Sequence, residues 1–250
     1  MASLKEQLNE LTRNYTACDV SDALLKLQKV PPGEVARAGF LADLTPYSPS
    51  IGPNHSLERT AGPATTFQFG TKDESPPEIA RENPEKHGFP PGRHWVDFTG
   101  DYAAANPTDV GFVVVIDQPQ GQFCAVTGGI VATRMGVLGA KAAVVNGRVR
   151  DVREMQLRGF PVWARGTSTV GTGAEAKAVA RDIPLNIGGV HVSPGDIVFC
   201  DPMNGVVVVS RDLLEPVLEL LPKLGDMDNH AKQAVEQGMS VTKAFKMFRS

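Results

Sequence analysis

Two stretches near the start of the chain carry hydrophobic residues at helical spacing. Leucines recur on one face from Ser3 to about Asn14, and the stretch ALLKLQ follows a polar group that can begin a helix. Asp19 or Ser21 is the expected N-cap of this second helix, because short side chains with an oxygen accept from the free N–H groups of a first turn. The pattern predicts two helices in this part of the chain.

The chain from Val30 to His94 is rich in proline, glycine and polar residues. Within it, the stretch ATTFQFG predicts a strand, because Thr65, Phe67 and Phe69 alternate with their neighbours. A proline-rich tract at about 72–94 is too long for a simple connection. Loops of that length are usually lids, oligomer contacts or disordered insertions, and the composition favours disorder or a contact arm.

Strand and helix patterns alternate in the middle of the chain. VGFVVVID predicts a buried strand, GGIVATRMGVLGAKA a helix opened by glycines, AAVVNG a strand, and DVREMQLRG a helix stopped by Gly159. FPVWARG predicts a further strand. HVSPGDIVFCDPMNGVVVVS predicts two strands separated by the turn Met203-Asn204-Gly205. This order is typical of an α/β domain with a mixed sheet.

Two helical patterns, LLEPVLELLPKL and DNHAKQAVEQGMSVTKAFKMF, close the chain. Nothing in the middle of the 250 residues has the composition of a linker between domains. We therefore expect one domain over 1–250, with an insertion at about 72–94 and a helical tail at about 212–250.

The composition is that of an ordinary globular protein, with 42% hydrophobic and 21% charged residues. The net charge is -3 and Lys and Arg are spread out, so we expect no nucleic-acid partner. Cys18, Cys124 and Cys200 are far apart and form no CxxC pair, which favours reduced thiols. No secretory signal and no run of 18 apolar residues is seen. These features predict a cytoplasmic protein without a membrane partner.

Candidate chemistry begins at Gly128-Gly129, between a predicted strand and a predicted helix. Free N–H groups and the positive end of the helix dipole could bind a carboxylate or phosphate there. The simpler interpretation is that the glycines only permit a tight turn. A dinucleotide fingerprint is excluded, because the residues after Gly129 do not complete GxGxxG.

A second polar group, Arg150-Asp151 with Glu154, follows the strand AAVVNG. Asp151 could simply cap a helix, and Arg150 could pair with Glu154 one turn later. The five histidines show no HxH or HExxH spacing and no GxSxG occurs, so a histidine metal site and a serine triad are not expected.

The two groups together form the pattern G-x20-R-D-x2-E, since twenty residues separate Gly129 from Arg150. With CDVSDAL, RTAGPATTF, FPVWARG, IGGVHVSPGDIV and DPMNGVVVVS, this pattern resembles the RraA-like superfamily over most of Thr16 to Ser210. That group includes aldolases of 4-hydroxy-4-methyl-2-oxoglutarate and 4-carboxy-4-hydroxy-2-oxoadipate, oxaloacetate decarboxylases, and regulators of ribonuclease E activity. The resemblance implies a swivelling β/β/α fold, assembled as a homotrimer or homohexamer with active sites at subunit boundaries.

The resemblance also implies roles for individual residues. Asp151 would bind Mg²⁺ or Mn²⁺, and Arg150 would contact the keto oxygen of a small 2-oxo acid. The backbone N–H groups of Ile130 and Val131, in the turn opened by Gly128 and Gly129, would hold the substrate carboxylate. A hard cation with few protein ligands suits such a site.

Further acidic residues would assist this site. Asp228 is the best positional match to an acid that the neighbouring subunit contributes through water, and Glu154 would support Arg150. The chain departs from the family at Gly129, where an aspartate of the pattern D-x20-R-D usually holds metal-bound water.

The leading hypothesis is therefore a metal-dependent lyase that forms a pyruvate enolate, as a class II pyruvate aldolase or an oxaloacetate decarboxylase does. A metal and a guanidinium both stabilise the charge that collects on the ketone oxygen. Two alternatives stay open. One is a non-catalytic regulator that binds a protein, and the other is a diverged enzyme of specialised metabolism that uses the same enolate site.

Overall fold

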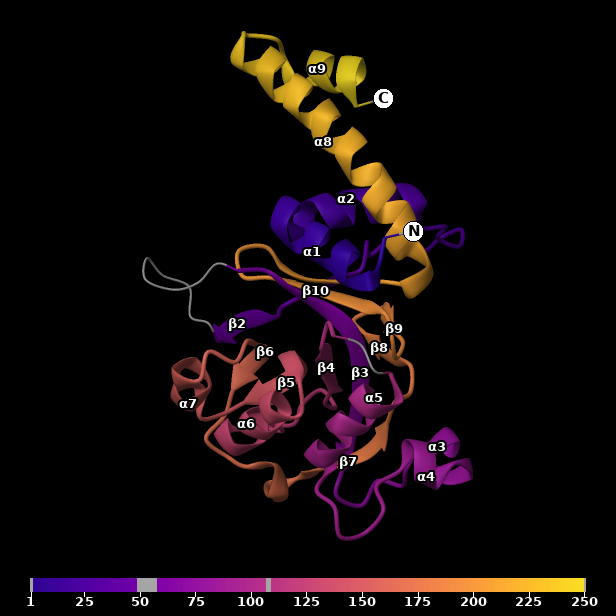
Figure 1. Ribbon diagram of the computed structural model, residues 1–250, viewed down its shortest axis with the longest axis vertical. Helices are drawn as coiled ribbons and strands as arrows, with labels where there is room; N and C mark the ends of the chain where they lie inside the picture. Colours follow the sequence, from indigo (N-terminus) through magenta and orange to yellow (C-terminus); the bar gives the residue numbers. More distant parts are fainter. Residues whose placement is uncertain (1, 49–57, 107–108, 250) are drawn as a thin grey trace.

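A computed structural model describes residues 2–48, 58–106 and 109–249. Most strands join one mixed sheet in the order β1-β11-β10-β3-β4-β5-β6-β2, with β7 also paired to β3 (Figure 1). Its strands are β1 (Phe40–Leu41), β2 (Thr45–Ser48), β3 (Thr60–Thr71), β4 (Phe112–Asp117), β5 (Ala140–Val149), β6 (Val162–Thr167), β7 (Ala176–Arg181), β10 (Ile197–Asp201) and β11 (Gly205–Val209). A separate hairpin is formed by β8 (Leu185–Ile187) and β9 (Val190–Val192).

Helices precede, connect and follow these strands. They are α1 (Leu4–Asn14), α2 (Ala17–Leu27), α3 (Glu78–Glu82), α4 (Pro84–His87), α5 (Thr99–Ala105), α6 (Gly129–Val137), α7 (Val152–Leu157), α8 (Leu214–Glu236) and α9 (Val241–Phe248). Short 3-10 turns occupy Trp95–Phe98, Thr172–Ala174 and Arg211–Leu213. Among the described residues, no helix is long and apolar enough to cross a bilayer.

The parallel strands β3, β4, β5 and β6 form the centre of the sheet, and α6 and α7 connect β4 to β5 and β5 to β6. Alternate residues of these strands enter different cores. Val114 and Ile116 pack with α6 and α7, whereas Val113 and Val115 pack on the side of the β8–β9 hairpin. Because both faces of these parallel strands are buried, their sequences are continuous apolar runs and do not alternate with polar residues.

The first two helices form where the leucine pattern places them, but the predicted cap of the second is wrong. Thr16, not Asp19 or Ser21, is the N-cap of α2. Asp19 lies three residues later, and its carboxylate accepts from the backbone N–H of Thr16 at 2.7 Å. The two residues form a reciprocal capping box, which the single-residue interpretation overlooked. The side-chain hydroxyl of Ser21 instead donates to the Ala38 carbonyl.

The two predicted C-terminal helices divide at a different place. The first was expected to end at Leu224, but α8 continues through Gly225 to Glu236, and α9 folds back beside its outer part, away from the sheet (Figure 1). The break comes at Gly238, which adopts a φ of 92°, and Ser240 then caps α9. Pro222 is exposed, and Leu218 and Leu221 beside it stay packed on the N-terminal helices. Packing therefore overrides the local cost of proline.

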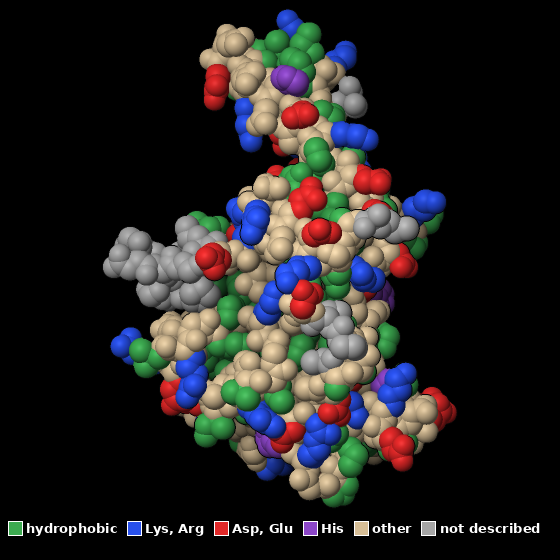
Figure 2. Space-filling model, viewed as in Figure 1, with side chains coloured by type: hydrophobic (Ala, Val, Ile, Leu, Met, Phe, Trp, Pro, Cys, Tyr) green, Lys and Arg blue, Asp and Glu red, His purple; other side chains and the backbone are tan. Residues whose placement is uncertain are grey.

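The proline-rich tract at about 72–94 is folded against β7. The guanidinium of Arg181 on β7 donates to the Gly88 carbonyl at 3.0 Å, and the ring of His87 lies 3.0 Å from the Arg181 carbonyl. The ring of Trp95, just beyond the tract, meets Phe67 and Phe69 on β3. Buried contacts therefore hold a segment whose composition favoured disorder or a contact arm, and of these disorder is wrong. On the outer surface, positive and negative side chains are interspersed (Figure 2).

Candidate functional site

The two glycines and the Arg-Asp pair meet at the carboxyl edge of the parallel strands. The chain after β4 returns beside the end of β5, where Thr127 and Val149 form a parallel bridge. The N–H of Arg150 donates to the Thr127 carbonyl at 2.9 Å. This pairing brings Gly128 and the start of α6 next to Arg150 at the start of α7, as expected for a crevice outside the ends of parallel strands.

Asp151 has an unusual backbone and a side chain that is free of the capping role. It is the N-cap of α7 with φ 56° and ψ 37°, in the left-handed region, and its side chain makes no cap hydrogen bond. The carboxylate instead accepts from the N–H of Gly129 at 3.3 Å and lies 3.3 Å from Nε of Arg150. The simple capping interpretation therefore fails. Aspartate adopts left-handed backbone more readily than most residues, and Asp43 and Asp182 adopt it as well.

Arg150 and Asp151 are both accessible, with 44% and 40% of their side chains exposed. The Arg150–Glu154 ion pair that helical spacing suggested is not found among the described residues, where Arg150 pairs with Asp151. Nη1 of Arg150 faces Gly171, so the guanidinium lies between that loop and the Gly128 turn. It is placed to meet a ligand on the solvent side.

The first turn of α6 offers free donors. The first helical bond runs from the N–H of Ala132 to the Gly128 carbonyl at 2.9 Å, so the N–H groups of Ile130 and Val131 have no acceptor within the helix. In the described part of the chain no other acceptor meets them. Ile130 itself is 84% exposed. The turn can therefore receive an anionic group from solvent.

Glu154 occupies the space beside Gly129. A Cβ atom built on Gly129 would collide with Oε2 of Glu154 and would lie 2.8 Å from its Cδ. A Cβ atom on Gly128 would lie 2.7 Å from Oδ2 of Asp151. In this arrangement the two carboxylates fill the space that a side chain at position 128 or 129 would need. Position 129 itself is glycine, but the carboxylate of Glu154 lies beside it. In the sequence, the sign of this acid is the glutamate that ends the pattern G-x20-R-D-x2-E.

The donor set suits a hard divalent cation. Asp151 and Glu154 place carboxylate oxygens against two adjacent glycines, and Mg²⁺ prefers one or two carboxylates completed by water and substrate oxygens. Over the described ranges, no group of three or more His, Cys, Asp or Glu gathers within one metal site. A cation here would consequently depend on substrate and on few protein ligands.

Asp228 is far along the chain from this turn and lies on α8. Its Oδ1 is 2.7 Å from Nε of Arg249, which also pairs with Asp22 at 3.2 Å. The ion pairs fasten the end of α9 to α8 and α2. A role for Asp228 in a neighbouring subunit stays a prediction.

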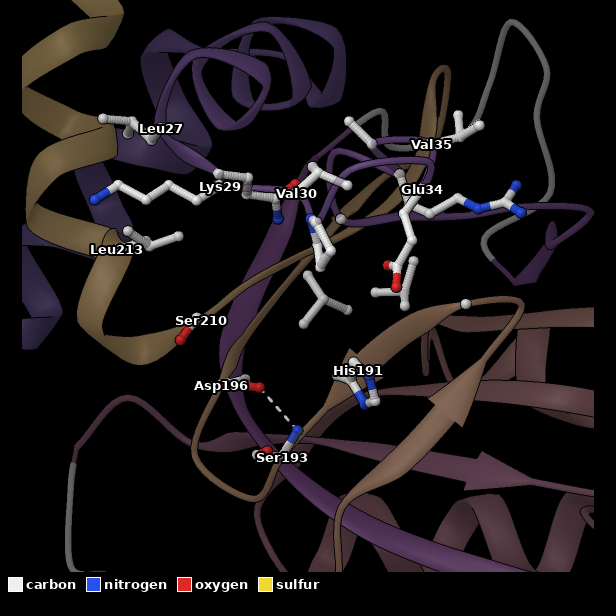
Figure 3. Close-up of a pocket in the computed structure, with 18 residues that line it drawn as sticks. Leu27, Lys29, Val30, Glu34, Val35, His191, Ser193, Asp196, Ser210 and Leu213 are labelled. Carbon is white, nitrogen blue, oxygen red and sulfur yellow. Dashed lines mark hydrogen bonds between the residues drawn. The ribbon is translucent and has the colours of Figure 1, made fainter.

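A larger hollow lies at another place in the described structure. It has a volume of about 520 Å³ and lies between the loop after α2 and the β8–β9 hairpin (Figure 3). Asp196 lies at its wall, but both of its oxygens accept backbone N–H groups, from Ser193 at 2.8 Å and Arg211 at 3.1 Å. The acid at this hollow is already bonded through both oxygens, whereas Asp151 and Glu154 at the Gly128 turn are exposed, accept fewer bonds and lie beside an accessible guanidinium. The Gly128 turn is therefore the better candidate site.

The chain belongs to the RraA-like family, whose model, described as Aldolase/RraA, matches residues 17–208. It is 25% identical over 224 residues to a protein of Halalkalibacterium halodurans provisionally named 4-hydroxy-4-methyl-2-oxoglutarate aldolase, covering 90% of this chain and 93% of that one. The expected family is thereby confirmed.

Solved structures agree on the fold. An uncharacterized protein of Pseudomonas syringae pv. tomato superposes with a TM-score of 0.67 at 21% identity, over 98% of both chains. Streptomyces coelicolor RraAS2, described as an unusual member of the RNase ES inhibitor RraA protein family, gives 0.63 at 22%, over 96% of this chain and 99% of that chain. The predicted α/β class, with a mixed sheet and C-terminal helices, is confirmed. The family includes named aldolases and named inhibitors, so its membership alone leaves the activity open.

Proposed function

We propose that this protein is a divalent-metal-dependent lyase that cleaves a C–C bond of a 4-hydroxy-2-oxo acid or of oxaloacetate. One observation carries the proposal. The carboxylates of Asp151 and Glu154 press on the Gly128-Gly129 turn beside an accessible guanidinium, that of Arg150. A protein that only binds a partner has no physical need for this combination.

Each group has a distinct task in such a reaction. The N–H groups of Ile130 and Val131 would bind the substrate carboxylate, and Arg150 would donate to the ketone oxygen as negative charge gathers there. Asp151, with Glu154 beside it, would hold Mg²⁺ or Mn²⁺. When bound, such a cation supplies Lewis-acid stabilisation of the same charge.

One site can serve both reactions, because retro-aldol cleavage and decarboxylation leave the same electrons on the ketone oxygen. Loss of CO₂ from oxaloacetate and loss of a carbonyl fragment from a 4-hydroxy-2-oxo acid both yield the enolate of pyruvate. Arg150 acts on that shared intermediate, so its contribution should appear with both substrates.

We further propose that the protein works in the cytoplasm as a homotrimer or homohexamer. The outer part of α8 and the helix α9 form a helical hairpin that projects away from the sheet (Figure 1). Exposed apolar side chains on this projecting hairpin, including Val235, Val241 and Phe245, support association. Cys18, Cys124 and Cys200 are unpaired, which suits a reducing compartment. A monomeric mass by light scattering at micromolar concentration, with full activity, would contradict the shared site.

The second candidate is a regulator that binds another protein. Ile130, Val137 and Leu157, on the two helices beside the site, are 84%, 71% and 73% exposed, which favours a contact surface. RraAS2, an RNase ES inhibitor family member, has this fold. On this interpretation the metal-loaded protein should cleave no 2-oxo acid.

The deciding experiment measures pyruvate release from oxaloacetate and from several 4-hydroxy-2-oxo diacids, with Mg²⁺, Mn²⁺ or a chelator. Replacing Arg150 by Ala should lower kcat by about 10²–10³ and change KM much less. Arg150→Lys should restore part of the rate, because lysine keeps the charge without the planar fork. Wild-type turnover by Arg150→Ala, with an unchanged melting temperature, would remove the central residue of the proposal.

A further inference from the structure

A cationic hollow lies beside the last part of β5, the strand that leads to Arg150. It has a volume of about 140 Å³ and is lined by the loop after β4 and by residues of β5 and β6. Arg148 and Arg165 contribute two guanidinium groups to it, and no acidic residue is part of its lining. An anionic ligand therefore fits the charge of this hollow.

Arg148 and Arg150 flank Val149, the last residue of β5. Val149 is fully buried in the core, whereas Arg148 and Arg150 are exposed. Two residues of extended chain span about 7 Å. A ligand held by Arg150 can therefore extend along the strand end toward Arg148.

The hollow is built from fixed groups. Nε and Nη1 of Arg148 donate to the carbonyls of Gln122 at 3.4 Å and Thr167 at 3.1 Å, which leaves Nη2 for a ligand. Nε of Arg165 donates to the side chain of Asn146, and its Nη1 lies 3.5 Å from Asp43, whose side chain is 80% exposed. Both guanidinium groups are thus held in place before any ligand binds.

A buried donor at the same wall supports this view. Oε1 of Gln122 accepts from the amide of Gln118 at 3.1 Å, but the buried Nε2 of Gln122 has no partner within the described ranges. A buried donor without an acceptor costs free energy. Gln122 lines the hollow, so a rotation of its side-chain amide would bring this donor to an anion bound there.

We infer that Arg148, with Arg165 and Gln122, forms a subsite for the distal carboxylate of a dicarboxylic 2-oxo acid, an inference that rests on the proposed function. In a five-carbon 2-oxo diacid the two carboxylates lie at opposite ends of the chain. One would meet the first turn of α6, and the other would meet Arg148. Arg148 is then a residue that determines specificity and takes no part in bond cleavage.

The test compares ligands that differ only at the distal end. 2-Oxoglutarate has the distal carboxylate and lacks the hydroxyl that retro-aldol cleavage needs, and 2-oxopentanoate has a methyl group instead. With Mg²⁺ present, calorimetry should show that wild type prefers 2-oxoglutarate. Arg148→Gln should weaken binding of 2-oxoglutarate by about 10–100-fold, the range for charge-assisted hydrogen bonds, and leave 2-oxopentanoate unchanged.

Two controls separate this subsite from the proposed activity. Arg158→Gln removes an exposed arginine that does not line the hollow and should change neither affinity. Arg148→Gln should also lower kcat/KM for 4-hydroxy-2-oxoglutarate but not for 4-hydroxy-2-oxopentanoate. Equal loss for both ligands, or no loss, overturns the subsite. A wild type that prefers the diacid through Arg148 yet cleaves nothing would keep the subsite and refute the lyase.

Discussion

Acidic residues of this protein fall into two groups that differ in what their oxygens already bind. Asp201 and Asp196, next to the antiparallel strands, are buried and accept several backbone N–H groups. Asp151 and Glu154, at the carboxyl edge of the parallel strands, are exposed and accept few bonds. A carboxylate whose oxygens are committed stabilises the fold, whereas an uncommitted one can bind a ligand.

Asp201 is the clearest member of the committed group. Its carboxylate accepts from the N–H groups of Ala17 and Met203, at 3.1 Å and 2.9 Å, and pairs with Arg59 at 3.3 Å. Burial opposes its ionisation, but hydrogen bonds from Asn204 and the backbone and the charge of Arg59 outweigh burial and lower its pKa. This one side chain ties α2 to the β10–β11 turn.

The largest expected effect is therefore on stability. Asp201→Ala should lower the free energy of unfolding by about 3–5 kcal/mol, because it leaves Arg59 and buried N–H groups without their partner. Urea unfolding measures the loss. A decrease below about 1 kcal/mol would show that the committed group does not hold the fold.

The lowered pKa of Asp201 also gives a pH dependence. Its stabilisation is present above the ordinary carboxyl pKa and is lost as the pH falls through the lower folded value. Wild type should lose more stability than Asp201→Asn between neutral pH and about pH 3.

The next largest effect concerns activity alone. Asp151→Asn keeps a residue that tolerates the left-handed backbone, so the melting temperature should hardly change. If Asp151 binds the cation, pyruvate release should fall by more than about 10²-fold, beyond the usual loss for a residue that only supports a ligand. Retained activity together with retained metal affinity would place Asp151 among the structural acids.

Glu154 should have a smaller effect. Glu154→Gln should lower activity by about 10–100-fold, as expected for a group that supports the metal or Arg150. Glu154→Ala removes the Oε2 and Cδ atoms that a Cβ on Gly129 would meet and leaves only the Cβ of residue 154, at 2.9 Å. With a small shift of that turn, adding Gly129→Asp should restore part of the rate. In the presence of Glu154, Gly129→Asp should instead impair activity, because both side chains need the same space. If Gly129→Asp changed the rate of pyruvate release equally with and without Glu154, then Glu154 would not take the place of an aspartate at position 129.

The smallest stability effects are expected at Arg249, which pairs with Asp22 on α2 and with Asp228 on α8. Matched variants of these two acids test the neighbouring-subunit role of Asp228. Asp22→Asn and Asp228→Asn each remove one surface partner of Arg249, so each should cost less than about 1 kcal/mol. Only Asp228→Asn should lower the rate of pyruvate release. Equal rates for the two variants would exclude the shared residue.

The pattern of the chain was sufficient for most elements and for the pieces of the site. Apolar runs and glycines located the parallel strands, α6 and α7, because burial and helix termination act over short distances. Those junctions singled out Gly128, Gly129, Arg150 and Asp151. The break in the tail was misplaced. The pattern ended the first helix at Leu224, but α8 continues through Gly225, which has no positive φ, to Glu236.

Only the tertiary structure decided how these residues serve each other. Spacing paired Glu154 with Arg150, but the fold turns the Glu154 carboxylate onto Gly129, twenty-five residues earlier. It also places Arg148 and Arg165, on neighbouring strands, around one hollow. Local patterns reflect interactions within a few residues, whereas strand pairing brings distant residues together through long-range contacts. The sequence thus determined the helices, the strands and the positions of the acidic residues along the chain. The pairing of β4, β5 and β6 determined which acidic residues lie exposed at the carboxyl edge of the sheet, where a ligand can reach them.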